Sequence, residues 1–249
     1  QKSYPIVEVV PFTSTGALSS GRKDLLKFKI TAAPEGDVGI AKFTFRIATT
    51  SATAQRNMID NVNVYAFTDP TFSTVATGVQ TDGAFLPTSV IISSPNDTGT
   101  YATSWASAST DIDIWAASAS NASTTLAIPA GQLRYFVVRG DATLGGSTYS
   151  VSTQLQGDSR FVASVGGIGL GAGPYCVSDG CKHGIASSTY MGTTTAIQTS
   201  LDNDFVWRPF STTTAVGASG GVLTDIDYST GYGVPGLPIT NTSSQNISQ

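Results

Sequence analysis

Residues 26–47, LKFKITAAPEGDVGIAKFTFRI, decide the fold class of this chain. Apolar and polar residues alternate without a break in residues 26–30 and again in residues 41–47, and this period of two places the apolar side chains on one face of a β-strand. Between the two runs stands Pro-Glu-Gly-Asp at residues 34–37, a composition typical of a turn. The stretch therefore predicts two antiparallel strands, each with one face in the core and one face in water.

The same period of two extends over much of the chain. It recurs at residues 62–66, 133–137 and 151–155, and Gly, Pro, Asn and Asp clusters separate the runs at short intervals. No long amphipathic helix is indicated, although residues 116–127 could form one or two helical turns. We predict an all-β fold, an antiparallel β-sandwich of the immunoglobulin-like or jelly-roll kind, with one or two packed sandwiches.

The alternation also predicts the core and a repeat. A small residue and a glycine precede the runs that begin at Leu26 and at Leu133, and a second run follows each of them, which suggests a duplicated unit or simply two ordinary hairpins. Around residues 133–138 both phases are apolar, so we expect that strand to be buried on both faces. The expected core residues are Phe28, Ile30, Phe43, Phe45, Val64, Phe136 and Val138.

Changes in composition divide the chain into three segments. Residues 1–20 hold a short apolar strand and a turn-rich tether, and residues 21–165 hold most of the alternating runs, which would form the sandwich core. Residues 166–249 are rich in Gly, Ser and Thr and contain both cysteines. We expect this last segment to be a C-terminal β region with a small cysteine loop.

Composition excludes several classes of function. Only 12% of the residues are charged and His183 is the single histidine, whereas about a quarter are Ser or Thr. The net charge is −4, and the basic residues cluster in the first quarter, where they alternate with apolar ones, which disfavours nucleic-acid binding. No apolar run is long enough to cross a bilayer, so we expect no transmembrane segment.

Three signs together favour an extracellular, cell-surface location. Lys and Glu are few, the two cysteines are close in sequence, and the chain carries four N-glycosylation sequons. The sequons are at Asn96, Asn121, Asn241 and Asn246.

Cys176 and Cys181 are separated by Val-Ser-Asp-Gly, a short segment that a disulfide can close across a turn. A zinc site would need further ligands, and His183 is the one nearby candidate. The disulfide is the favoured interpretation, and a metal site or free thiols are the alternatives.

Paired aspartates raise the question of Ca²⁺. They occur at Asp111 and Asp113, Asp202 and Asp204, and Asp225 and Asp227. Oxygen pairs on one face of a strand suit hard cations, but none of the three has the spacing of an EF-hand loop. Solvated turn aspartates are the simpler interpretation of each pair, and we expect no cofactor.

A catalytic function is not expected. The one candidate base, His183, lies beside the expected disulfide, and Ser178 and Asp179 are more simply turn residues. A glycosidase would need paired carboxylates, and the two glutamates, Glu8 and Glu35, both stand near the N-terminus.

Short segments near both ends of the chain resemble those of a group of known proteins. DFVW at residues 204–207, DIDY at residues 225–228 and GYGVPGLP at residues 231–238 resemble the closing region of uncharacterised secreted β-sandwich surface proteins of ultrasmall, uncultivated bacteria. KSYPIV at residues 2–7 and the runs within residues 26–45 are similar to their N-terminal part. The resemblance implies a surface-exposed all-β protein and supplies no catalytic residues.

The N-terminal strand is the main functional candidate. Residues 4–11, YPIVEVVP, are short, apolar and β-branched, and the turn-rich residues 13–21 follow them. Subunits of donor-strand filaments use such a strand to complete a neighbouring subunit. We therefore expect a homopolymeric, pilus-like extracellular fibre, with the assembly strand formed by Tyr4, Ile6, Val7, Val9 and Val10.

Three alternatives remain open at this point. The N-terminal strand can be the first strand of its own sandwich. The protein can be a monomeric adhesion or carbohydrate-binding module that recognises host or cell-surface glycans, with Trp105, Trp115 and Trp207 as stacking platforms. It can also be a viral coat component, because jelly rolls share this composition.

We predict that Cys176 and Cys181 are oxidised to each other. The closed loop is short, so its stabilisation should be about 2 kcal/mol. In intact-mass analysis the unreduced, unfolded protein should take up no alkylating reagent, and the reduced protein should take up two equivalents. Two alkylated thiols before reduction would contradict the disulfide.

Overall fold

A computed structural model of the chain describes residues 3–11, 20–51, 57–85, 107–116, 125–144, 149–157, 204–209, 229–231, 233–237 and 245–248. These residues form eleven strands and no helix. In chain order the strands are β1 (Pro5–Val9), β2 (Gly21–Ala32), β3 (Val38–Ser51), β4 (Asn57–Phe67), β5 (Ser107–Trp115), β6 (Leu126–Ile128), β7 (Leu133–Leu144), β8 (Tyr149–Leu155), β9 (Phe205–Pro209), β10 (Ser229–Thr230) and β11 (Gln245–Ser248).

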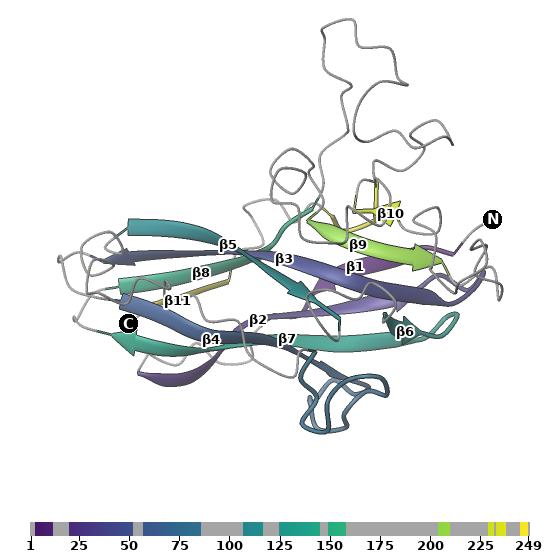
Figure 1. Ribbon diagram of the computed structural model, residues 1–249, viewed down its shortest axis with the longest axis horizontal. Helices are drawn as coiled ribbons and strands as arrows, with labels where there is room; N and C mark the ends of the chain where they lie inside the picture. Colours follow the sequence, from purple (N-terminus) through teal and green to yellow (C-terminus); the bar gives the residue numbers. More distant parts are fainter. Residues whose placement is uncertain are drawn as a thin grey trace, which may run out of the picture.

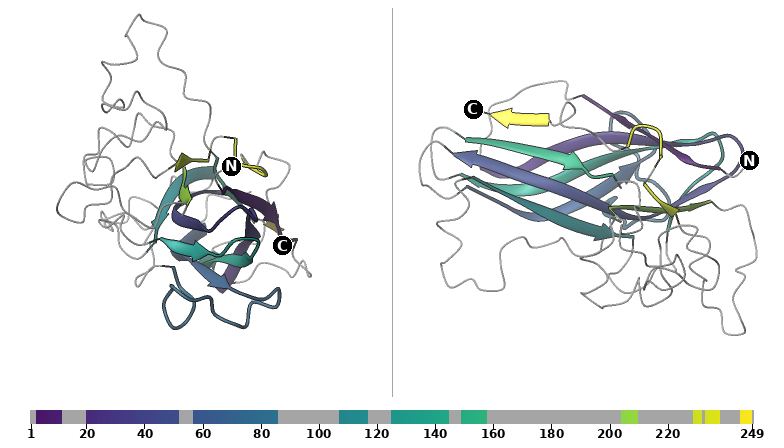
Figure 2. Two further views of the ribbon diagram at one scale, coloured as in Figure 1. Left: turned by 90° about the vertical axis from the view of Figure 1, so that its right-hand side faces the viewer. Right: turned by 90° about the horizontal axis from the view of Figure 1, so that it is seen from above.

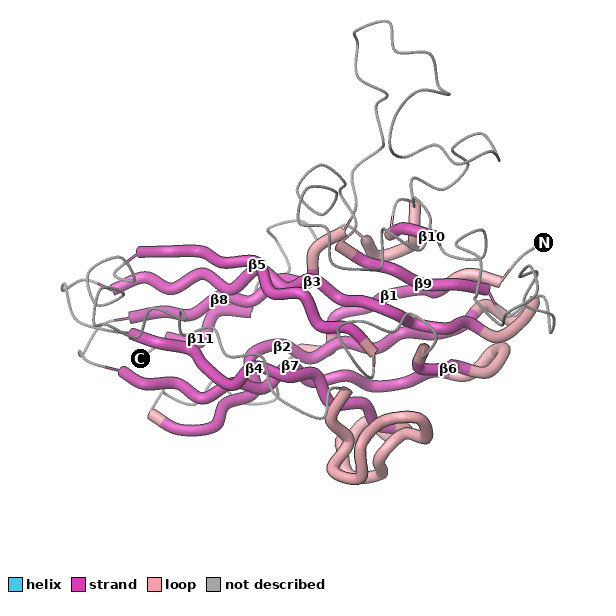
Figure 3. Tube along the Cα trace, in the orientation of Figure 1, coloured by secondary structure: helices cyan, strands magenta, loops and turns pink. Residues whose placement is uncertain are grey.

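The strands form two antiparallel sheets that pack face to face (Figure 1 and Figure 3). Sheet A has the order β1-β2-β7-β4, and sheet B has the order β10-β9-β3-β8-β11, with β5 and β6 also paired to β3. Viewed along its long axis, the molecule shows the strands arranged around a common interior (Figure 2). The predicted all-β antiparallel sandwich is confirmed.

Strand β3 is the centre of sheet B and is paired along both of its edges. It pairs with β5 over Lys42 to Thr50 and with β8 over Phe45 to Ser51, so these two partners lie on opposite edges. Near its start, β3 pairs with β9 from Val38 to Phe43. Lys42 and Phe43 pair with both β9 and β5, so these two strands lie on opposite edges of β3, and β9 is on the same edge as β8. Strand β6 lies on the other edge, in line with β5.

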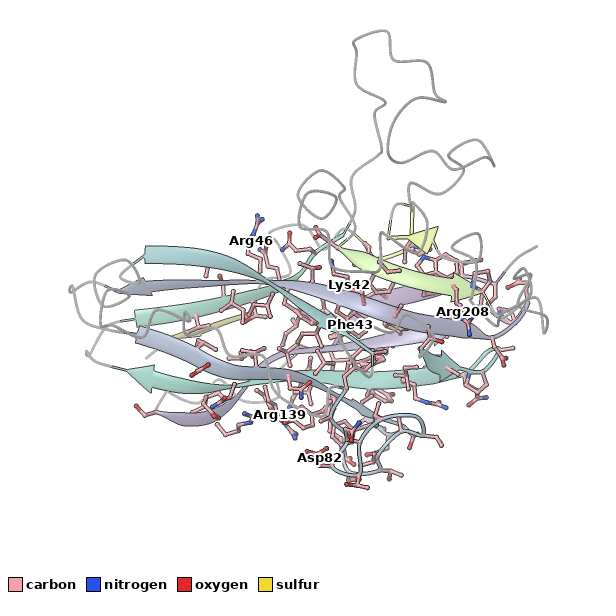
Figure 4. The ribbon with its side chains drawn as sticks, in the orientation of Figure 1. Lys42, Phe43, Arg46, Asp82, Arg139 and Arg208 are labelled. Carbon is pink, nitrogen blue, oxygen red and sulfur yellow. The ribbon has the colours of Figure 1, made fainter. Side chains whose placement is uncertain are left out.

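The space between the sheets is filled by aromatic rings. Phe28 of β2 stacks on Phe136 of β7, with ring centroids 5.0 Å apart. Phe43 of β3 meets both rings edge-on, at 5.5 Å and 5.4 Å, and so joins sheet B to sheet A. Figure 4 shows Phe43 between the two sheets. Every expected core residue is fully buried: Phe28, Ile30, Phe43, Phe45, Val64, Phe136 and Val138.

Strand β7 is buried on both faces, as its two apolar phases predicted. Phe136 and Val138 face the main core, and Val137 is also fully buried. Val137 belongs to a second, smaller cluster with Tyr65, Phe67 and Ala84. That cluster lies on the outer face of sheet A.

The expectation of one wet face on β3 is wrong for part of the strand. Lys42 is 7% exposed and Thr44 is 2% exposed, although both belong to the polar phase. Arg46 is exposed, and in Figure 4 it points away from the sandwich. The alternation did not reveal this because the neighbours are distant in sequence: Lys42 pairs with β5 and with β9, and Thr44 lies opposite Asp113 and accepts a hydrogen bond from Gln156 N–H at its carbonyl.

The two suspected repeat units occupy equivalent places. Strands β2 and β7 both begin close to a glycine with positive φ, Gly21 at +111° and Gly131 at +68°. They are neighbours in sheet A, and the strands that follow them, β3 and β8, are neighbours in sheet B. An internal two-fold repeat would produce this arrangement.

All three segments expected from composition contribute to one core. Val7 comes from residues 1–20, Phe205 and Trp207 come from β9, and Val234 and Leu237 follow β10. The strands before and after the central segment thus complete the same two sheets.

We predict that Phe43→Ala destabilises the fold by about 3–5 kcal/mol, because it leaves a cavity where rings from both sheets meet. The change should appear as a lower midpoint of urea unfolding. Tyr4→Ala is the control, since Tyr4 is exposed and a surface change should stay within about 0.5 kcal/mol. Equal midpoints for the two variants would contradict the central place of Phe43.

Candidate functional site

The expected assembly strand is β1, and it lies at the edge of sheet A. It pairs antiparallel with β2 of the same chain, from Pro5 opposite Ala32 to Val9 opposite Phe28. Two further backbone bonds extend the pairing: Ala33 N–H donates to Tyr4 O at 3.0 Å, and Val10 N–H donates to Lys27 O at 2.9 Å. In the single chain, β1 is therefore the first strand of its own sandwich.

The side chains of β1 alternate between the core and the surface. Val7 is 2% exposed and belongs to the main core, and Val9 packs partly buried against that core. Glu8 points outward and forms an ion pair with Lys29 at 3.1 Å. Ile6 is half-buried, and Tyr4, just before the strand, is 39% exposed. Pro5 and Val7 are the two buried residues of the strand, and Val7 belongs to the main core.

Ser3 fixes the start of the strand. Its side chain is buried, and its hydroxyl donates to Ala33 O at 3.2 Å and lies against Gly36 O. These acceptors belong to the turn between β2 and β3. A hydroxyl at this position therefore sets where β1 enters the sheet.

The outer edge of β1 faces residues 233–237, which we call the C-terminal turn. Because Val10 N–H points toward β2, the amide of Val7 points the other way, and it donates to Pro235 O at 2.9 Å. Gly236 lies directly against the backbone of Val7, with φ of +85°. This turn covers the edge that β2 leaves open.

A second feature lies on the outer face of sheet A, under residues 68–85, which we call the cover loop. Figure 1 shows this loop in blue beside β4 and β7. The ring of Phe72 meets Phe67 and Tyr135 edge-on, at 5.8 Å and 5.9 Å between centroids. The loop also pairs with the outer edge of β4, because Ala66 N–H donates to Gly83 O and Phe85 N–H donates to Val64 O.

Cations surround these rings. The guanidinium carbon of Arg139 lies 4.9 Å from the ring centroid of Tyr65, and Lys27 Nζ lies 4.9 Å from that of Phe72. Asp24 joins both cations, at 2.9 Å from Arg139 Nε and 3.0 Å from Lys27 Nζ. Figure 4 shows Arg139 on the outer face of sheet A, near the cover loop with its labelled Asp82. The charges are thus paired, and the cluster is a small second core.

A bulge in β4 adds a polar contact beside this cluster. The register with β7 shifts between Asp60 and Asn63, and Asn61 takes a positive φ of 49°. Asn61 Nδ2 then donates to Asp141 Oδ2 at 2.9 Å, and Arg22 bridges to Oδ1 at 3.1 Å. The Asn61 hydrogen bond, followed by Arg22, lowers the pKa of the Asp141 carboxyl below its ordinary value.

Asp69 holds the start of the cover loop. Its carboxylate accepts hydrogen bonds from the backbone amides of Thr71, Ser73 and Thr74 and from two hydroxyls. The side-chain bond from Thr71 and the amide of Thr74 lower the pKa of Asp69 well below its usual range. This arrangement fixes a tight turn that directs Phe72, at a positive φ of 56°, onto the sheet.

The cover loop and its aromatic cluster were not predicted from the sequence. One signal was present, because Tyr65 and Phe67 alternate with Val64 and Ala66, so both phases of β4 are apolar. The Asp69-Pro70 pair marked a turn but not its partner.

Most other expected site residues lie outside the described residues. These are Cys176, Cys181, His183, Asn96, Asn121, Asn241, Trp105, Asp202, Asp225 and Asp227. Asn246 lies in β11, and Asp111 and Asp113 lie in β5 opposite Arg46 and Thr44 of β3. Trp207 is 8% exposed, which does not suit a stacking platform.

The described part of the chain holds neither a metal-binding cluster nor a membrane-spanning helix. No group of three or more His, Cys, Asp or Glu residues there could hold a metal ion. No helix there is long and apolar enough to cross a membrane.

No protein-family model matches the chain, and no characterised protein matches it. The resemblance of its two ends to secreted surface proteins stays a prediction.

We predict that the Asp69 carboxyl titrates below the same carboxyl in a free peptide of residues 68–74. A carboxyl with a lowered folded pKa stabilises the fold above its unfolded pKa of about 3.9, and this contribution is lost as the pH falls through the folded pKa. NMR titration of the carboxyl carbon measures both midpoints. Asp69→Asn should speed amide exchange at Thr74, and equal midpoints in protein and peptide would contradict the capping role.

Proposed function

We propose that this protein is a structural subunit of an extracellular filament, assembled by donor-strand complementation through β1. The observation that carries the proposal is the position of β1. It is an edge strand near the N-terminus, its backbone pairs with β2 along one edge, and Val7 is buried in the main core. Such a strand leaves its place by breaking one ladder and by withdrawing Val7 from the core.

The pairing of β1 with β2 inside one chain would have an equivalent between two chains in the filament. Strand β1 of one subunit would occupy the same place beside β2 of the next, so the contacts would be the same in both states. Eleven residues, 10–20, connect β1 to β2, and a chain of this length spans up to about 35 Å when extended. That length covers several strand spacings of about 4.8 Å.

The composition of the surface supports the extracellular part of the proposal. Charged residues are few, and Ser and Thr are abundant. In the described part of the chain, several of the charges that exist are used in pairs on the outer face of sheet A, such as Glu8 with Lys29 and Asp24 with Arg139. A surface of this kind suits close packing of identical subunits better than charge-guided binding of a different partner.

Deleting residues 1–11 tests the proposal. The full chain should form filaments visible by electron microscopy, and the truncated chain should stay folded and monomeric because its acceptor edge on β2 has no donor. A synthetic peptide of residues 1–11 should bind the truncated chain and block growth. Filament formation by the truncated chain, or a full chain that stays monomeric at every concentration, would overturn the proposal.

Charge placed on the two faces of the peptide gives a matched comparison. Val7→Asp should abolish peptide binding, because it buries an unpaired carboxylate at a cost of several kcal/mol. Tyr4→Asp carries the same charge at an exposed position and should bind like the unchanged peptide. Isothermal titration against the truncated chain measures both. Equal affinities would show that β1 does not insert as it does in the single chain.

A further inference from the structure

We infer that the C-terminal turn is a removable cover over the outer edge of β1, and that it limits the release of this strand. The cover itself is a property of the single chain. Its effect on assembly rests on the proposed function.

The outer edge of β1 needs a cover because exposed strand edges template uncontrolled pairing. Pro5 has no N–H to offer, so the strand begins with a position that cannot donate. The next outward amide, that of Val7, is taken by Pro235 O at 2.9 Å. The turn therefore blocks pairing of a further strand at Val7 while it is in place.

The fit between turn and strand depends on Gly236. A Cβ built on this residue would lie 1.7 Å from Val7 O and 2.8 Å from Val7 C, which no side chain can occupy. Both clashing atoms belong to the backbone, so rotation of a side chain cannot relieve the overlap. Gly236 also has a positive φ of +85°, which a glycine adopts without strain.

The turn is held from sheet B rather than from β1. It follows β10, which pairs with β9, and Val234 and Leu237 insert into the main core. The turn is closed by its own hydrogen bond from Leu237 N–H to Val234 O at 2.9 Å. Among the described residues, the backbone contact with β1 is one hydrogen bond and one close approach, at Val7.

This arrangement makes the turn a latch with two independent attachments. One attachment anchors it to sheet B and the core, and the other retains β1. The second can open while the first persists, which frees the edge of β1 without unfolding either sheet. Release of β1 then requires this contact to open as well as the ladder with β2, and the freed strand has the chemistry to pair with a second copy of this chain.

Alanine substitutions at Gly236 and Gly233 distinguish the clash with the Val7 backbone from the strain of a positive φ. Gly236→Ala should push the turn away from Val7, whereas Gly233→Ala has a similar positive φ, +73°, and nothing within 4 Å of the added Cβ. Amide exchange of Val7 in the isotopically labelled monomer should rise roughly tenfold in Gly236→Ala, the effect of losing one hydrogen bond, and stay near its original rate in Gly233→Ala. Val234→Ala, which weakens the anchor in the main core and leaves the Val7–Pro235 hydrogen bond in place, should give a smaller rise in a folded protein.

The rate of filament growth is the second readout. Faster Val7 exchange together with faster growth in Gly236→Ala supports both the latch and the filament. Faster exchange without filaments in any variant leaves the latch standing and rejects the filament. Equal Val7 exchange in the Gly236→Ala and Gly233→Ala proteins, or no rise in Val234→Ala if Gly236→Ala fails to fold, overturns the latch.

Discussion

The double pairing of β3 is the constraint on which the rest of the structure depends. Every strand of sheet B is joined to β3 directly or through β8 and β9, so its backbone bonds hold that sheet together. The inner face of the same strand carries Phe43 and Phe45, which meet Phe28 of sheet A. A strand that is fixed along both edges and packed on its inner face cannot exchange, so any mobile element must lie at the far edge of a sheet.

Sheet A ends in two edges, and each is covered in a different way. The cover loop pairs with β4 at Val64 and Ala66, packs Phe72 on the sheet and is held by the Asp69 cap. The C-terminal turn contacts the backbone of β1 at Val7 alone. Because the cover loop has several attachments and the turn has few along β1, the β1 edge is the one that can open first.

The alternation of apolar and polar residues within a strand correctly predicted which side chains of that strand face the core. The inward phases of β2 and β3 and the double burial of β7 follow from residues such as Phe28, Phe45 and Val137, whose neighbours in sequence show the period. Burial of Lys42 and Thr44 does not follow, because it depends on strands that are distant in sequence. The contact of Pro235 with Val7 was equally hidden: residues 231–238 were noted only for their resemblance to other surface proteins, and no local pattern connects them to a strand at the other end of the chain.

The free energies of β1 paired within one chain and between two chains explain why the contact with the C-terminal turn would affect assembly. In the closed chain and in a filament, β1 would make the same backbone bonds and bury the same Val7 side chain, so these terms cancel. What remains is the difference between the encounter of β1 with its own β2, to which the chain tethers it, and its encounter with β2 of a separate subunit. A tether of about ten residues gives an effective concentration of about millimolar. Closure within one chain is therefore favoured in dilute solution, and polymers are favoured where subunits crowd. Near that balance, the hydrogen bond and the close approach at Gly236 add about 1 kcal/mol to the cost of opening the β2 ladder, which is enough to change the fraction of free strand several-fold.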